Sequence, residues 1–290
     1  PTRDNMQVLK TSNHAQPMSK PRQRVNPWLH RWRALTALVG RDIFKFMRQP
    51  TRLASALVRP LLWFLVFSAG FHNVFGIAII PPYETYIEYK VYMVPGLLGM
   101  IALFNGMQSS LSLVYDREMG VMRHLLTAPL ARGWLLLFKL LAGASLSLLQ
   151  MVVFIGIAWL FGVYFTWGPI LLALPVMALA CVLLAAVGLL LSVYVRQMEN
   201  FAGAMNFVIF PMFFVSPALY PLWKLEESGS YWLHLLAQFN PFTYVVEAIR
   251  FALHGQLHSL GIATMVCGTL LCYSIALGGY DPQRGWAKHH

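Results

Sequence analysis

The sequence predicts an all-α membrane protein with six transmembrane helices, and three observations support this fold class. Of its 290 residues, 58% are hydrophobic and only 11% are charged, whereas a soluble domain usually carries about 25% charged residues. The mean hydropathy is +0.57. Several apolar runs reach the roughly 20 residues that cross a bilayer as a helix, and helices are the open-chain structures that satisfy their own backbone polar groups in lipid.

The chain begins with a polar, basic tail over residues 1–27, which lacks the apolar core of a secretory signal peptide. Residues 28–50 follow between two prolines and place Trp28, Trp32 and later apolar residues at spacings of three or four. Arg and Lys side chains lie largely off that face, so an amphipathic helix in the headgroup layer is expected. Membrane anchoring is favoured over a mechanical role for this helix.

Six spans are expected within a transmembrane domain of residues 51–282. A short C-terminal tail, residues 283–290, follows this domain. Their approximate limits are 53–75, 91–115, 134–162, 169–195, 201–220 and 258–280. Eighteen of the 22 Lys and Arg residues then fall on one side, which the positive-inside rule places in the cytoplasm together with both termini. Arg59 and Lys139 are expected near the cytoplasmic ends of their spans, where long basic side chains reach water.

The segment 116–133 separates the second span from the third. Asp116 is expected to cap a short helix of about residues 117–126, with Glu118 in its first turn, and Pro129 to end it. The segment is longer than the 2–8 residues or so that a simple helical connection needs, and it carries several apolar side chains. A docking surface is therefore favoured over a plain connector.

Residues 221–257 lie between the fifth and sixth spans and contain two apolar pieces, 231–239 and 242–254, each too short to cross a bilayer. Asn240-Pro241 separates them, so a re-entrant helical hairpin is expected. Glu247 and Arg250 are three residues apart and can pair on one helix face. A structural and a functional role for this pair both stay open.

Several kinds of chemistry have no motif in the sequence. No phosphate-binding loop of the type G-x-x-x-x-G-K-[ST] occurs, so the chain is not expected to hydrolyse nucleotide itself. The three cysteines lie in apolar runs without metal-site spacing, and no metal site is expected. An ion-coupled carrier would need an ionisable group at mid-membrane, and an integral-membrane transferase would need clustered acidic or His residues. Both classes remain alternatives.

Two motifs carry a resemblance to a known family. The pattern E-x-G-x-x-x-x-L-x-x-x-P spans Glu118 to Pro129, and N-P-F-T-Y-x-x-E-A-I-R spans Asn240 to Arg250. With the interfacial helix and six spans, these motifs resemble the type-2 ABC exporter permeases, which include drug-resistance, nodulation-factor and O-antigen export permeases. The likeness runs from about residue 28 to residue 281.

The resemblance implies a permease subunit of the bacterial inner membrane that exports a lipidic, glycan-linked or hydrophobic substrate. It implies membrane lipids, a second permease copy and two ATP-binding cassette subunits as partners, with ATP and magnesium bound by the latter, no cofactor on this chain and no nucleic acid. The expected coupling residues are Asp116, Arg117, Glu118, Gly120, Met122, Arg123, Leu125, Leu126 and Pro129. The expected substrate path comprises Trp63, Phe67, Phe104, Gln108, Asn206, Phe213 and Phe214. The expected hairpin residues are Asn240, Pro241, Tyr244, Glu247 and Arg250.

Overall fold

The computed structural model describes residues 33, 35–37, 39–40, 44, 48, 50–70, 81–83, 87–119, 132–195, 197–227 and 229–279. Its contacts divide the chain into two compact units, Pro1–Thr36 and Ala37–His290. The architecture below is that of the second unit. The expected interfacial helix over 28–50 falls largely outside the described residues, as do both tails.

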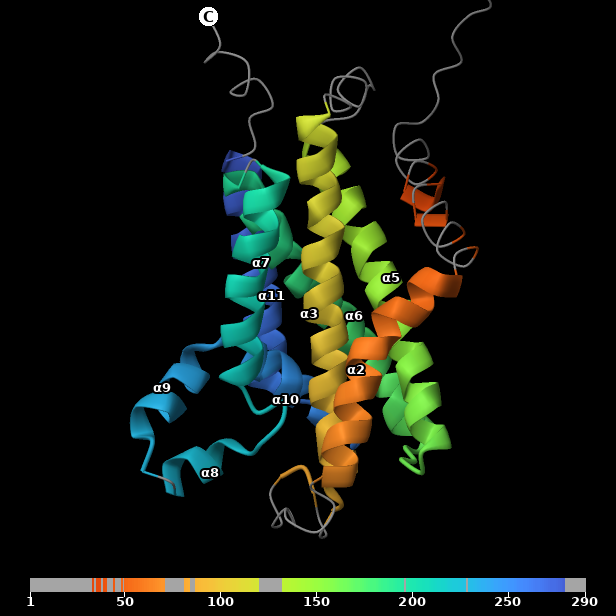
Figure 1. Ribbon diagram of the computed structural model, residues 1–290, viewed down its shortest axis with the longest axis vertical. Coiled ribbons are helices and arrows are strands. Elements are labelled where there is room, and N and C mark those ends of the chain that lie inside the picture. Colours follow the sequence, from red (N-terminus) through yellow and green to blue (C-terminus); the bar gives the residue numbers. More distant parts are fainter. Residues whose placement is uncertain are drawn as a thin grey trace, which may run out of the picture. The chain divides into compact units, whose positions relative to one another are not determined.

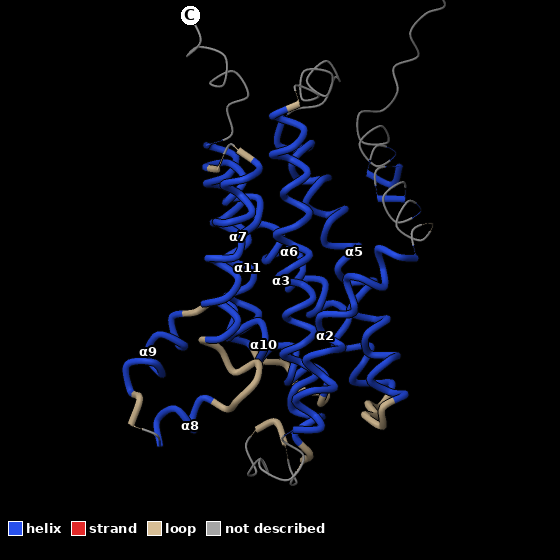
Figure 2. The backbone as a smooth tube through the Cα atoms, viewed as in Figure 1, coloured by secondary structure: helices blue, strands red, loops and turns tan. Residues whose placement is uncertain are grey.

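The described part of the second unit is built from helices (Figure 2). Six of them are long: α2 Pro50–Gly70, α3 Tyr89–Glu118, α5 Arg132–Leu160, α6 Trp167–Tyr194, α7 Met198–Phe214 and α11 Ser259–Gly279. Three are short: α8 Leu222–Glu227, α9 Tyr231–Phe239 and α10 Pro241–Leu253.

Four of these helices, α3, α5, α6 and α11, are long and apolar enough to cross a membrane. Their ends agree with the expected spans to within three residues. The apolar part of α2, Ala56–Gly70, is shorter, and α7 has 17 residues. At 1.5 Å per residue α7 is about 25 Å long, slightly less than a hydrocarbon core of about 30 Å. The count of six spans therefore stays a prediction.

The long helix α3 packs against α2, α5, α6, α7 and α10 (Figure 1), and it is the most buried of the four helices long enough to cross a membrane. The backbones of α3 and α6 come into close contact at Gly106. A Cβ at this position would lie only 2.7 Å from the carbonyl carbon of Leu184, so a larger residue would not fit. A Cβ on Gly143 of α5 would lie 2.6 Å from Ser109 Oγ of α3. Small residues permit such close contacts between helices in membranes.

The bundle has two ends, which Figure 1 shows at the bottom and the top of the view. At the end called here the hairpin end, α2 ends, α3 begins, and α8, α9 and α10 lie. At the opposite end, called here the Glu118 end, α3 ends, α5 begins and α6 leads into α7. There the hydroxyl of Tyr273 on α11 donates to Gly133 O on α5 at 2.7 Å, which fixes the last helix to the start of α5.

Candidate functional site

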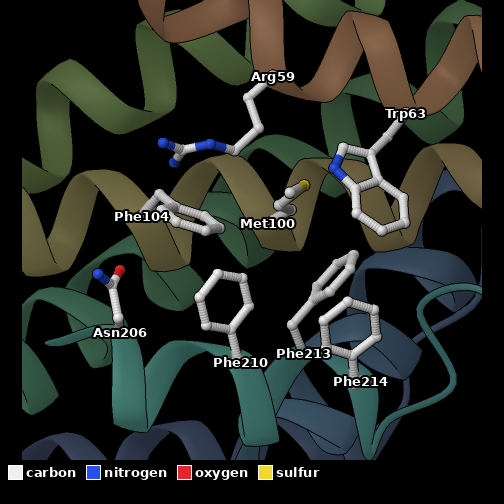
Figure 3. A pocket seen from close by; sticks show the side chains of 8 residues that line it. All are labelled: Arg59, Trp63, Met100, Phe104, Asn206, Phe210, Phe213 and Phe214. Atoms are coloured by element: carbon white, nitrogen blue, oxygen red, sulfur yellow. The ribbon is translucent and has the colours of Figure 1, made fainter. Parts of the chain in front are cut away.

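An aromatic pocket lies between α2, α3 and α7, about midway along α3, and has a volume of about 160 Å³ (Figure 3). That space holds several water molecules or one part of a larger ligand. Each helix contributes side chains at spacings of three or four residues, so one face of each helix meets the pocket. The lining residues are Arg59 and Trp63 of α2, Met100 and Phe104 of α3, and Asn206, Phe210, Phe213 and Phe214 of α7.

The aromatic rings of the pocket contact one another across two helices. The indole of Trp63 is 5.9 Å from the ring centroids of both Phe213 and Phe214, the former in an edge-on arrangement. Phe210 stacks on Phe214 at 6.1 Å. On its other side, Trp63 stacks on Phe67 at 5.0 Å. Such offset and edge-on pairs fix the ring orientations and present a rigid apolar surface.

Arg59 supplies the positive charge of this pocket. Its guanidinium carbon lies 3.8 Å from the centroid of the Phe104 ring, in a cation–π contact. Phe104 is halfway along the 30-residue helix α3, so Arg59 lies beside the middle of the bundle. Arg59 is also exposed in the single chain, so the prediction that it reaches water at the end of its span stays a prediction.

Five of the seven residues expected along a substrate path line this pocket, namely Trp63, Phe104, Asn206, Phe213 and Phe214. Phe67 contacts it through Trp63, whereas Gln108 is exposed and does not line it. Sequence reasoning missed Arg59, Met100 and Phe210. Helical periodicity could have found them, because each lies four residues from a lining residue of its own helix.

At the Glu118 end, two charged side chains at the end of α3 form hydrogen bonds with the junction between α6 and α7. Arg117 Nη1 donates to Ser192 O at 3.1 Å, near the last turn of α6. Glu118 Oε2 accepts from the backbone N–H of Met198, the first residue of α7, at 3.3 Å. Negative charge is favourable at a helix N-terminus and positive charge at a C-terminus, so both placements follow from the helix dipole.

The expected cap at Asp116 is wrong, because α3 continues through Glu118 and makes residues 116–118 its last turn. No glycine or proline lies between Gly106 and Gly120, so the helix of the second span continues past residue 116. Met119 is described and is exposed. The other expected coupling residues, Gly120, Met122, Arg123, Leu125, Leu126 and Pro129, lie outside the described residues.

The junction of α9 and α10 falls at Asn240-Pro241, as the sequence predicts. The Asn240 side chain caps α10 by accepting from Phe242 N at 3.0 Å, and Pro241 occupies the first turn, where a missing N–H costs nothing. The same side chain donates to Met212 O at 2.7 Å and to Val215 O at 2.5 Å, both at the end of α7. Re-entry of α9 and α10 into the membrane stays a prediction.

The segment after α7 is held by a second group of side chains. Arg250, only 2% exposed, pairs with Glu247 and donates through Nη2 to Pro217 O at 2.6 Å. Its guanidinium carbon lies 4.1 Å from the ring centroid of Tyr92 on α3, whose hydroxyl donates to Pro217 O at 3.1 Å. The predicted Glu247–Arg250 pair is thus confirmed. Of the remaining hairpin residues, Tyr244 is half-buried on α10.

Gly96 of α3 makes this arrangement possible. A Cβ at that position would lie 2.2 Å from the carbonyl oxygen of Ala218, so the segment after α7 fits only against a glycine. Two titratable side chains pack against each other near Arg250, since the ring centroids of Tyr83 and His254 are 4.7 Å apart and His254 Nδ1 is 2.8 Å from Arg250 O. Burial raises the pKa of Tyr83 to about 12 and lowers the pKa of His254 from its usual 6.5.

Several known proteins are similar to this chain in sequence. The family model described as ABC-2 type transporter matches residues 33–254. A protein named putative transport permease ycf38, from Porphyra purpurea, is 30% identical over 220 residues, which cover 75% of this chain and 72% of the relative.

Two proteins of Escherichia coli strain K12 are also similar. The inner membrane transport permease YadH is 23% identical over 256 residues, covering 86% of this chain and 96% of YadH. The probable multidrug ABC transporter permease YbhR is 27% identical over 171 residues, covering 58% of this chain and 45% of YbhR. The family model covers most of the chain, and the described helices and their junctions fall largely within it. The chain therefore belongs to the ABC-2 type transporter family of membrane permeases.

Proposed function

We propose that this chain is the transmembrane subunit of an ATP-binding cassette exporter of the bacterial inner membrane, with both termini in the cytoplasm. It moves a lipidic, glycan-linked or hydrophobic substrate, and separate ATPase subunits hydrolyse the ATP. Membership of the ABC-2 family supports the transport role. YadH is named an inner membrane transport permease, which supports the location. YbhR is named a probable multidrug ABC transporter permease, which supports the substrate class.

The observation that carries the proposal is the bond between Glu118 and Met198. It joins the end of α3, where the segment 116–133 begins, to the first residue of α7, which lines the aromatic pocket. An ATPase docked on 116–133 through the expected coupling residues therefore has a direct mechanical connection to the pocket wall. A partner shifts a two-state protein only by contacting the two states differently, and in the proposal the ATPase makes those contacts on the segment 116–133.

The pocket and its surroundings suit an apolar substrate passing beside a second permease copy. Phe207 of α7, next to Asn206, is 80% exposed, and Phe210 and Phe214 are also exposed. Exposed aromatic surface of this kind marks an interaction site. In the proposed assembly two copies of the chain face each other across α2 and α7, and two ATPase subunits bind at the Glu118 end.

The two alternative functions, an ion-coupled carrier and an integral-membrane transferase, gain no support from the site. Arg59 lies beside the middle of α3, but a guanidinium keeps its proton at physiological pH and so cannot carry protons for an ion-coupled transporter. A transferase would need grouped acidic or His side chains. Within the described residues, no three His, Cys, Asp or Glu side chains gather closely enough to bind a metal ion.

ATP turnover by the purified complex tests the proposal. The chain is reconstituted with its ATPase in nanodiscs, and a panel of lysolipids and lipophilic drugs is screened for stimulation. Glu118→Ala removes the acceptor at the start of α7, a bond of about 0.5–1.5 kcal/mol, so stimulated turnover should fall about twofold to tenfold while the complex still assembles. Glu227→Ala, which removes an exposed carboxylate of α8, is the matched control. Unchanged stimulation in Glu118→Ala would reject the proposed connection, and transport without any ATPase would reject the function.

A further inference from the structure

The aromatic pocket has a polar end and an apolar end. Figure 3 shows the Arg59 guanidinium and the Asn206 amide on one side, and Trp63, Phe213 and Phe214 grouped on the other. The two polar groups come from different helices, α2 and α7, whose facing surfaces enclose the pocket. This division corresponds to an amphipathic ligand.

The charge of Arg59 has no acidic partner among the residues that the structure describes. Two ion pairs there, Glu88–Lys90 and Glu247–Arg250, lie near the hairpin end and do not include Arg59. Arg59 is exposed in the single chain, but in a membrane a charge among apolar side chains is costly unless it is paired, and the Phe104 ring compensates it only in part. An anion entering the pocket would complete the pairing.

The geometry leaves the donors of Arg59 available. A guanidinium is planar and carries five N–H donors in that plane. Because its carbon lies 3.8 Å above the ring centroid of Phe104, the ring takes one face of the group and leaves the donors at its edges. Those edges match two oxygens of a phosphate or carboxylate. In the described part of the chain no residue hydrogen-bonds to the Asn206 amide, so it can add a further donor.

We propose that Arg59 selects the substrate: the pocket binds an amphiphile with one anionic head group, a phosphate or a carboxylate. The head group lies on Arg59 and Asn206, and the apolar chain lies on Trp63, Phe213 and Phe214. Lipophilic cations are disfavoured by the same charge. The inference rests on the proposed transport function, whose substrate class it narrows.

Lipid binding by the purified chain, measured by native mass spectrometry without an ATPase, tests the inference. The matched probes are oleoyl lysophosphatidate and monoolein, which differ by the phosphate group. We expect the wild-type chain to prefer lysophosphatidate, and Arg59→Gln to weaken its binding about tenfold or more while monoolein binding stays the same. Arg59→Lys should keep most of the preference, and Lys139→Gln, which neutralises a cation of α5 outside the pocket, should keep all of it.

Three outcomes would overturn the inference. The first is equal binding of both probes by the wild-type chain. The second is an equal loss of both probes in Arg59→Gln with recovery in Arg59→Lys, which would mean that Arg59 only packs on Phe104. The third is displacement of lysophosphatidate by inorganic phosphate at the same concentration, which would indicate a simple anion site. Because no ATPase is present, loss of ATP-driven transport in the complex is a separate result and concerns the proposed function alone.

Discussion

Replacement of Arg250 by Met would measure how strongly the hairpin end is held together. Arg250 has 3% of its side chain exposed, pairs with Glu247 on the same helix, and joins α10 to Pro217 O and to the ring of Tyr92. Met keeps an unbranched apolar side chain of similar reach, so the ring contact is partly retained while the charge is lost. The matched control is Lys90→Met, which breaks the Glu88–Lys90 pair at 2.7 Å, a more exposed pair in which Glu88 is 56% and Lys90 24% exposed.

The expected loss of stability follows from burial. Breaking a buried ion pair by removing one partner costs about 3–5 kcal/mol, because the other charge is left unpaired. Glu247 is 23% exposed and keeps some water, and Pro217 O keeps its bond from the Tyr92 hydroxyl. The lower end applies, so Arg250→Met should lose about 3 kcal/mol. An exposed pair contributes about 0–1 kcal/mol, and Lys90→Met should lose no more than that.

Unfolding by dodecyl sulfate in mixed micelles, followed by tryptophan fluorescence, gives the free energies of unfolding for all variants. The double variant Glu247→Gln with Arg250→Met removes the orphaned carboxylate and should recover part of the loss. Equal losses for Arg250→Met and Lys90→Met would refute the assignment of Arg250 to a buried, stabilising pair. So would a loss below about 1 kcal/mol for Arg250→Met.

Two further predictions concern the same region. Gly96→Ala places a Cβ 2.2 Å from Ala218 O and should cost about 2–3 kcal/mol in the same assay, whereas Gly156→Ala, with nothing within 4 Å, should be neutral or gain up to about 1 kcal/mol; equal effects would contradict the close contact. Burial lowers the pKa of His254 in the folded chain, so stability should be full above about pH 6.5 and fall as the pH drops below it, because the unfolded chain binds the proton more tightly. Comparing unfolding of the wild-type chain and His254→Gln between about pH 7.5 and 5.5 isolates this slope, and identical slopes would contradict it.

The sequence predicts the long helices well, because a continuous apolar run has few alternatives to a helix in a membrane. The break at Asn240-Pro241 was also predictable, since proline fits the first turn of a helix and asparagine caps it. The end of α3 was not predictable from local signals. Glu118 looks like a first-turn acid of a new helix, yet its partner is Met198, 80 residues later. The place of Arg59 in the pocket was missed for a similar reason, because its contact with Phe104 joins two different helices.

The fastening of α7 determines how that helix can move. The Asn240 side chain donates to Met212 O and Val215 O at the C-terminal end of α7, so a rigid α7 would rotate about that end. The helix is about 25 Å long, and a 2 Å displacement at Met198 moves Asn206, near the midpoint, by about 1 Å and leaves Phe213 almost in place. In the proposed mechanism such a movement would withdraw Asn206 from the polar end of the pocket while Phe213 keeps its place, so a bound amphiphile would lose its contact with Asn206 first.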